Sequence, residues 1–179
     1  MSENKDDIRP MPEAGGCLPP EGRLAGVDFG TVRIGIATCD PSQHWVTPYE
    51  TYTRRKEKLD NEYFCKLAED ESLVGWVVGL PIHCDGKESQ KSTEAREFCQ
   101  WLQEATQRPY VLYDERFTTR EARRLLQEAP MSAKQKKKRV DGLAAHLILS
   151  HYLENERAKA EFALREEAIE PPRLPGLED

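Results

Sequence analysis

Two apolar runs joined by a short turn, LAGVDFGTVRIGIATCD (residues 24–40), decide the predicted fold. In the second run, β-branched apolar residues occupy every second position from 32 to 36, which is the period of a β-strand. Gly30 and Thr31 then lie in a tight turn between two strands. A third strand predicted over residues 45–52 would complete an antiparallel meander.

The remainder of the chain alternates predicted helices with predicted strands. Apolar spacing predicts a helix over 54–70, a buried strand over 74–81, a helix through 95–102, a strand over 109–115, a helix over 118–128 and an apolar helix over 140–153. The helix at 118 begins with a capping box formed by Thr118 and Glu121. Residues 129–139 break the apolar pattern and are predicted to be a mobile loop. The buried face of the last helix is predicted to hold Val140, Leu143, Ala144, Leu147, Ile148 and His151, and Leu149 and Tyr152 are predicted to add to its burial.

This order of elements predicts an α/β fold. The expected sheet is mixed, with a three-strand antiparallel meander followed by parallel βα units, and it has helices on both faces. The chain has 179 residues, which suits one domain with tails. We expect a disordered N-terminal tail over residues 1–22, a folded domain over 23–153 and a charged, Pro-rich C-terminal extension over 154–179.

Composition excludes several classes of protein. No apolar run reaches the roughly 18 residues of a membrane span, and the N-terminus lacks the apolar region of a secretory signal. The five cysteines form no C-x-x-C pair, so we expect reduced thiols rather than disulfides or a zinc site. These features predict a cytoplasmic protein with no membrane contact. The net charge of −6 excludes a diffuse polycation.

Three acidic residues occur where a carboxylate is costly or well placed for chemistry. Asp28 interrupts an apolar strand, Glu115 ends a later strand, and Asp141 lies in the first turn of the apolar last helix. Each has an ordinary alternative role: Asp28 binding amides of the adjacent turn, Glu115 pairing with Arg116, and Asp141 capping its helix. Converging carboxylates would repel each other unless a hard divalent cation neutralised them. The three acids therefore suggest a Mg²⁺ or Mn²⁺ site, with two ions roughly 4 Å apart that cleave a phosphodiester.

Four motifs carry a resemblance to a known family. GVDFGTVRIGIA, VVGLPIHCDG, DERFTT and VDGLAAHLIL, in this order and with compatible spacing, resemble the YqgF family of RNase H-like nucleases over residues 23–153. That family includes Holliday-junction resolvases and nucleases that trim the 5′ end of precursor 16S rRNA. The resemblance implies an RNase H-like fold and metal-dependent hydrolysis of phosphodiester bonds. Precursor 16S rRNA is the expected substrate, in ribosome biogenesis, and a Holliday junction is the alternative.

The resemblance also implies roles for individual residues. Asp28, Glu115 and Asp141 match the three acids of the family, which are its catalytic and metal-binding residues. Asp85 and Asp114 also lie in family motifs and are expected to support the site rather than to form it. The chain departs from the commoner family pattern at His83 and Cys84 and at Phe117, none of which replaces one of the three acids.

Positive charge is concentrated in one segment. Residues 116–139 contain nine basic and two acidic residues, a local charge of +7, which leaves −13 for the rest of the chain. We expect this segment to bind phosphates beside the acids, although such runs are often only a solvated surface. The predicted nucleic-acid contacts are Thr31, Arg33, Arg116, Lys134, Lys136, Lys137, Lys138 and Arg139. The sequence shows no dimer seam, so a monomer or a weak homodimer is expected.

Two other functions remain open at this point. The DFGT segment at residues 28–31 also resembles the phosphate-binding loop of actin-like and sugar-kinase enzymes, although those enzymes use two lobes and this chain has length for one. A non-catalytic RNA-binding assembly factor would keep the basic segment but would not need the three acids. The four histidines are expected to be structural, and His146 and His151 on the last helix do not have i, i+4 chelating spacing.

Overall fold

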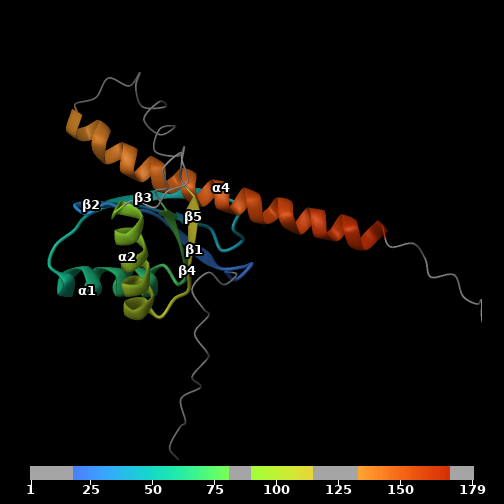
Figure 1. The fold of residues 1–179 in the computed structure, drawn as a ribbon, viewed down its shortest axis with the longest axis horizontal. Coiled ribbons are helices and arrows are strands. Elements are labelled where there is room, and N and C mark those ends of the chain that lie inside the picture. Colours follow the sequence, from blue (N-terminus) through green and yellow to red (C-terminus); the bar gives the residue numbers. More distant parts are fainter. Residues whose placement is uncertain (1–17, 81–89, 115–132, 170–179) are drawn as a thin grey trace, which may run out of the picture.

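The computed structural model describes residues 18–80, 90–114 and 133–169, and within the last range it describes side chains from residue 140 to residue 163 (Figure 1). The elements are β1 (Arg23–Asp28), β2 (Arg33–Cys39), β3 (Val46–Thr53), α1 (Glu57–Asp70), β4 (Leu73–Leu80), α2 (Gln90–Thr106), β5 (Tyr110–Asp114) and α4 (Ala133–Ile169). The helix predicted over residues 118–128 lies outside the described residues.

A five-stranded sheet with the order β3-β2-β1-β4-β5 forms the centre of the described chain. β1, β2 and β3 pair antiparallel, whereas β4 pairs parallel with both β1 and β5. The predicted meander and the predicted parallel units are both confirmed. Because β1, β4 and β5 run in the same direction, their carboxyl ends lie at one edge of the sheet.

Helices cover the two faces of the sheet, as predicted. Figure 1 shows α1 and α2 on one side and the long α4 crossing the other. Successive residues of β1 point alternately to the two faces of the sheet. Ala25 and Val27 pack in the core that contains Phe64 of α1 and Phe98 of α2. Leu24 packs in the second core, which contains residues of α4. This alternation fixes the face of the sheet to which each later residue of β1 points.

The last helix differs from its prediction at both ends. α4 spans 37 residues from Ala133, so residues 133–139 are helical and the loop predicted over 129–139 is wrong for them. The helix also continues past Leu153 to Ile169, through most of the segment that was assigned to the extension. Lys, Arg, Gln, Glu and Ala dominate both added stretches and are strong helix formers, so intrinsic propensity extends the helix beyond its apolar core.

The predicted buried face of α4 is confirmed in part, at Ala144, Ile148, Leu149 and Tyr152. Gly142, Ala145 and Leu153 are buried as well, although they were not predicted to be. Of the predicted face, Val140, Leu143, Leu147 and His151 are only half-buried. The reason is close approach to the sheet: a Cβ built on Gly26 would lie 2.6 Å from the Leu149 Cβ and 2.7 Å from the Ala145 carbonyl oxygen.

The start of the folded part also lies earlier than predicted. Leu18 is 4% exposed and packs in the same core as Leu24, and the Gly22 amide donates a hydrogen bond to the Pro41 carbonyl at 2.8 Å. The prediction of a disordered tail is therefore wrong for residues 18–22, where one buried leucine outweighs the polar composition. Residues 1–17 and 170–179 lie outside the described residues, and the division of the chain at 22 and 153 stays a prediction. In the part of the chain that the structure describes, no helix is long and apolar enough to cross a membrane.

Candidate functional site

Asp28 is the last residue of the central strand β1 and lies at the edge of the sheet where β1, β4 and β5 end. Leu24 and Gly26 of the same strand face α4, so the alternation of a strand points Asp28 to the α4 side as well. The carboxylate is half-buried. In the antiparallel register, Asp28 pairs with Gly35 of β2.

Gly35 brings the second acid to the same edge. A Cβ built on Gly35 would lie 2.0 Å from the Asp141 carbonyl oxygen and 2.4 Å from its carbonyl carbon. The backbone of α4 therefore touches the backbone of β2 beside the register partner of Asp28. Two of the three predicted acids, Asp28 and Asp141, thus both lie next to Gly35 on one face of the sheet, although 112 residues separate them in the chain.

Arg33 holds the carboxylate of Asp141. It lies two residues before Gly35 on the same face of β2, and its Nε donates to the Asp141 Oδ2 at 2.7 Å. The two side chains are 25% and 19% exposed, so the pair is partly shielded from solvent. Arg33 was predicted to contact nucleic acid. The structure gives it a position beside the acids, where it neutralises part of their charge and orients one of them, and its contact with substrate stays a prediction.

The donor chemistry of this edge fits a hard divalent cation. Asp28 and Asp141 offer carboxylate oxygens, which are the ligands that Mg²⁺ and Mn²⁺ prefer. Among the described residues, no group of three or more His, Cys, Asp or Glu residues is close enough to hold a metal ion. The described part of the chain therefore offers two candidate ligands, Asp28 and Asp141, and their role as metal ligands stays a prediction.

Comparison with known proteins identifies the family. The sequence model of the family described as "RuvX: Holliday junction resolvase" matches residues 22–155. The chain belongs to the RuvX family. The match confirms the family resemblance that the four motifs carry, and it starts and ends within two residues of the predicted domain.

Several RuvX relatives share most of this chain. A protein of Rhodopirellula baltica named "Putative pre-16S rRNA nuclease" is 48% identical over 146 residues, which cover 82% of this chain and 84% of the relative. A protein of the same name from Rhizobium meliloti is 37% identical over 147 residues, covering 82% of this chain and 89% of the relative. A solved structure, "T. thermophilus RuvC in complex with Holliday junction substrate", aligns at 13% identity with a TM-score of 0.49, covering 76% of this chain and 96% of that one.

The third predicted acid, Glu115, lies outside the described residues. The residue before it, Asp114, ends β5 and pairs with Leu80 of β4. Because β5 runs parallel to β1, this residue lies at the same edge of the sheet as Asp28. The described chain reaches this edge of the sheet at Asp114, and the place of Glu115 in the site stays a prediction.

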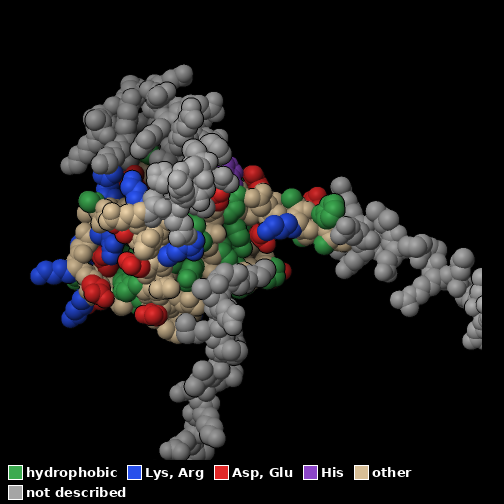
Figure 2. Space-filling view, in the orientation of Figure 1, with side chains coloured by type: hydrophobic (Ala, Val, Ile, Leu, Met, Phe, Trp, Pro, Cys, Tyr) green, Lys and Arg blue, Asp and Glu red, His purple; other side chains and the backbone are tan. Residues whose placement is uncertain are grey.

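Much of the predicted phosphate-binding segment also lies outside the described residues, including Arg116. Lys134, Lys136, Lys137, Lys138 and Arg139 lie on the first turns of α4, directly before Asp141, although their side chains are not described. Figure 2 shows Lys and Arg side chains interspersed with Asp and Glu over the described part of the face in view. The described surface on this face is therefore mixed in charge.

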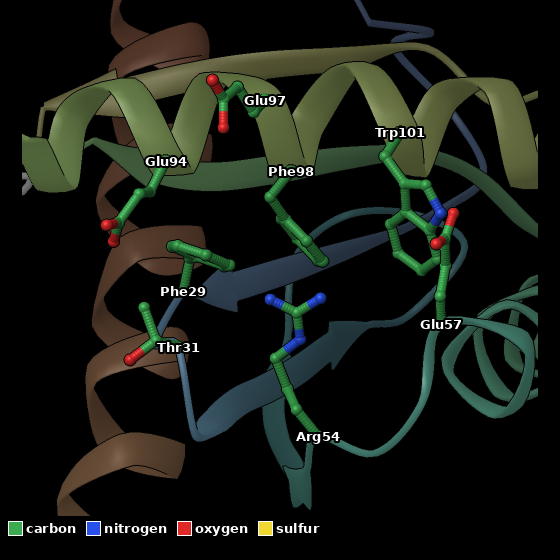
Figure 3. Close-up of a pocket in the computed structure, with 8 residues that line it drawn as sticks. All are labelled: Phe29, Thr31, Arg54, Glu57, Glu94, Glu97, Phe98 and Trp101. Carbon is green, nitrogen blue, oxygen red and sulfur yellow. The ribbon is translucent and has the colours of Figure 1, made fainter.

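A pocket of about 310 Å³ lies on the other side of the sheet edge (Figure 3). The lining residues are Phe29, Thr31, Arg54, Glu57, Glu94, Glu97, Phe98 and Trp101. Thr31 is exposed and lines this pocket, and its predicted contact with nucleic acid stays a prediction. Sequence reasoning missed the pocket because a turn, a loop and two helices contribute to it. The available signal was the stripe of Glu94, Phe98 and Trp101 along one face of a helix, which places acids beside aromatic rings.

His146 lies on α4 five residues after Asp141. Burial lowers the pKa of its imidazole, and the nearby His151 lowers it further. Within the described part of the chain, its buried Nδ1 has no hydrogen-bond partner. The predicted structural role for this histidine is therefore incomplete, since a satisfied core histidine has partners for both ring nitrogens.

Proposed function

We propose that this RuvX-family chain is a divalent-metal-dependent nuclease that hydrolyses a phosphodiester bond near the 5′ end of precursor 16S rRNA. The observation that supports the proposal is the contact of the Asp141 backbone with Gly35, the residue of β2 that pairs with Asp28. The names of the relatives support this choice of substrate. Such a role in ribosome biogenesis would place the protein in the cytoplasm.

Each residue has a defined part in this proposal. Asp28 and Asp141 would hold Mg²⁺ or Mn²⁺, and Glu115 would complete the ligand set from the segment that follows β5. The bound metal supplies an activated water and stabilises the leaving oxygen. Arg33 keeps Asp141 oriented and limits the repulsion between the two carboxylates. The basic residues at the start of α4 would attract the phosphate backbone, and the positive end of the helix dipole would add to this attraction.

A Holliday-junction resolvase is the second candidate, because the family itself is described by that activity. A resolvase cuts two strands and needs two paired sites, whereas a nuclease that trims RNA ends can work as a monomer. We favour the monomer acting on RNA. An RNA-binding assembly factor would bind without cleaving, and a kinase-like enzyme would hydrolyse ATP.

The deciding experiment compares cleavage of a precursor 16S RNA fragment and a four-way DNA junction, each with Mg²⁺ or Mn²⁺. We expect cleavage of the RNA, dependence on the added metal, and loss of cleavage in Asp28→Asn with an unchanged melting temperature. Asp70→Asn is the matched control, because Asp70 is an exposed α1 carboxylate paired with Lys66. Cleavage by Asp28→Asn at the wild-type rate would contradict the catalytic role of Asp28. Cleavage of the DNA junction but not of the RNA would make the junction the substrate.

A second experiment tests the basic residues of α4. Replacing Lys136, Lys137 and Lys138 by Gln should weaken RNA binding and reduce the slope of log affinity against log salt by about 2, since each single-strand phosphate contact contributes roughly 0.7. Lys58→Gln, an exposed change on α1, should leave the slope unchanged. An unchanged slope in the triple variant would remove these lysines from the interface.

A further inference from the structure

The pocket behind the β1–β2 turn has the size and the lining of a ligand site. Its volume of about 310 Å³ lies at the lower end of the roughly 300–1,000 Å³ range of small-molecule sites. Phe29, Phe98 and Trp101 provide flat apolar walls, and the Phe29 and Phe98 rings stack with their centroids 4.7 Å apart. The Arg54 guanidinium carbon lies 5.8 Å from the centre of the Phe29 ring and 5.7 Å from that of the Phe98 ring.

Arg54 lies at the centre of the pocket and is held from behind. Its Nε donates to the Oδ2 of Asp60 at 3.2 Å, and Asp60 is 1% exposed. Asp60 also accepts hydrogen bonds from the Tyr52 hydroxyl at 2.7 Å and from the Arg55 amide at 2.8 Å. Its carboxylate is therefore fixed by the protein. Figure 3 shows the far end of the Arg54 guanidinium pointing into the pocket toward Phe98.

Carboxylates surround this guanidinium. Figure 3 shows Glu94 on the side of Phe29 and Thr31, and Glu57 on the side of Trp101. Glu97 comes from the same helix as Glu94 and also lines the pocket. The pocket therefore offers a planar pair of donors in its centre and acceptors around it, between aromatic rings. A phosphate would be repelled by the glutamates, and a cationic side chain would be repelled by Arg54.

A flat ring with acceptors on one edge and donors on another satisfies all of these groups. Guanine has this pattern: its O6 and N7 accept from an arginine, and its N1–H and N2 amino groups can donate to a carboxylate. Adenine would turn its N6 amino group toward the guanidinium. Cytosine has no ring N–H beside its amino group to donate to the carboxylate, and uracil lacks an exocyclic amino group. Bases that are not paired can also stack on aromatic side chains.

We propose that this pocket receives an unpaired guanine of the nucleic acid beside the bond that is cut. Asp28 and Phe29 are consecutive residues, so their Cα atoms lie about 3.8 Å apart at the edge of the sheet. The alternation of β1 points Asp28 toward α4, and Phe29 packs in the opposite core. A phosphate held at Asp28 and a base turned around the sheet edge onto Phe29 would then belong to the same or to adjacent nucleotides. The placement beside the scissile bond rests on the proposed nuclease function.

The test measures binding and needs no cleavage. Fluorescence anisotropy in EDTA gives the Kd of labelled ten-nucleotide uridine RNAs that carry one central guanine, adenine or inosine. We expect the guanine RNA to bind about tenfold more tightly than the adenine RNA, a modest value for one base-specific arginine contact. Inosine, which lacks the N2 amino group, should fall between them. Equal Kd values for guanine and adenine would overturn the proposal.

Variants of the pocket show whether its residues cause the preference. Glu94→Gln and Arg54→Lys should each reduce the guanine preference to less than threefold, while Glu104→Gln, an exposed change on the same helix, should retain it. Circular dichroism checks that Arg54→Lys, which keeps a cation near Asp60, remains folded. A preference that persists in both pocket variants would overturn the assignment to this pocket.

Two further results separate this proposal from the nuclease function. Free 5′-GMP should compete at least tenfold more weakly than the guanine RNA, and equal competition would overturn the placement of the base within a nucleic acid. A guanine preference in a protein that cleaves neither RNA nor a junction would support the pocket and reject the nuclease. Cleavage without any base preference would support the nuclease function and reject the guanine pocket.

Discussion

Replacing Gly35 by alanine should separate the two acids while leaving the fold intact. Gly35 lies within β2, where extended backbone accepts any residue, so space rather than conformation excludes a side chain. The added Cβ would lie 2.0 Å from the Asp141 carbonyl oxygen, and real Cβ contacts essentially never fall below 3.0 Å. The start of α4 must therefore move by at least about 1 Å, because the atoms in conflict belong to two backbones.

The displacement has separate consequences for activity and stability. A misplacement of about 1 Å at a catalytic group can reduce the rate about 100-fold. Overpacking of this kind costs about 1–3 kcal/mol of unfolding free energy. For a chain of this length, each 1 kcal/mol lowers the melting temperature by about 2–4 °C. We therefore expect a folded protein that melts several degrees lower and has lost most of its kcat.

The assay compares initial cleavage rates of the precursor RNA at a temperature well below each melting midpoint. Gly75→Ala is the matched control, because its Cβ would meet the Leu18 side chain at 2.7 Å on β4, away from both acids. Because the end of the Leu18 side chain can shift, Gly75→Ala should lose less stability than Gly35→Ala, and it should keep its kcat. Wild-type kcat in Gly35→Ala would refute the reasoning, and so would an equal loss of kcat in Gly75→Ala.

Three further predictions concern single residues. Arg33→Gln removes the cation 2.7 Å from Asp141, so titration calorimetry should show Mn²⁺ binding several-fold more tightly than to wild type, and a weaker or unchanged affinity would contradict this. Asp60→Asn weakens three hydrogen bonds to a buried carboxylate and should lower the unfolding free energy by about 2 kcal/mol, measured by urea denaturation; a change within 0.5 kcal/mol, roughly that of a surface substitution, would contradict it. The pKa of His146 is lowered in the folded state, so protonation favours unfolding and stability falls as the pH drops below about 6.5. Between pH 7.5 and pH 5, the melting temperature of His146→Gln should therefore fall less than that of the wild type. An equal fall in both proteins would contradict this.

The sheet was predictable because its signals are local. The alternating residues of β2 and the continuous apolar run of β4 are each readable within eight residues. The three acids were also selected individually, each from its position within one element. The position of Asp141 on the same face as Asp28 could not be predicted from the sequence, because it depends on how closely α4 approaches the sheet.

The approach of α4 is a tertiary effect that two glycines permit. Because Gly26 has no side chain, the α4 backbone at Ala145 can lie against it. Gly35 leaves the same room for the backbone at Asp141, one helical turn earlier. Both contacts lie along one line of the helix, and this line sets the buried face. Helical periodicity predicts only which residues are apolar and share a face, and it does not rank Ala145 above Leu143 or Leu147. It therefore could not identify an alanine as the residue of closest contact with the sheet. The loop residues 133–139 were mispredicted for the opposite reason, since propensity acts there without an apolar pattern.

The same alternation that builds the two cores also divides the functional residues between the two sides of the sheet. Leu24 and Gly26 face α4, so the other even-numbered residues of β1 face α4 as well. Ala25 and Val27 face α1 and α2, so the odd-numbered residues face that side. A shift of β1 by one residue would exchange the two sets, placing Asp28 against the aromatic pocket and Phe29 against Arg33 and Asp141. That shift would also bury the wrong side of β1 on both faces at once. The packing of the four apolar residues 24–27 therefore determines that the Asp28 carboxylate lies on the side of Asp141 and that the Phe29 ring lies on the side of Arg54.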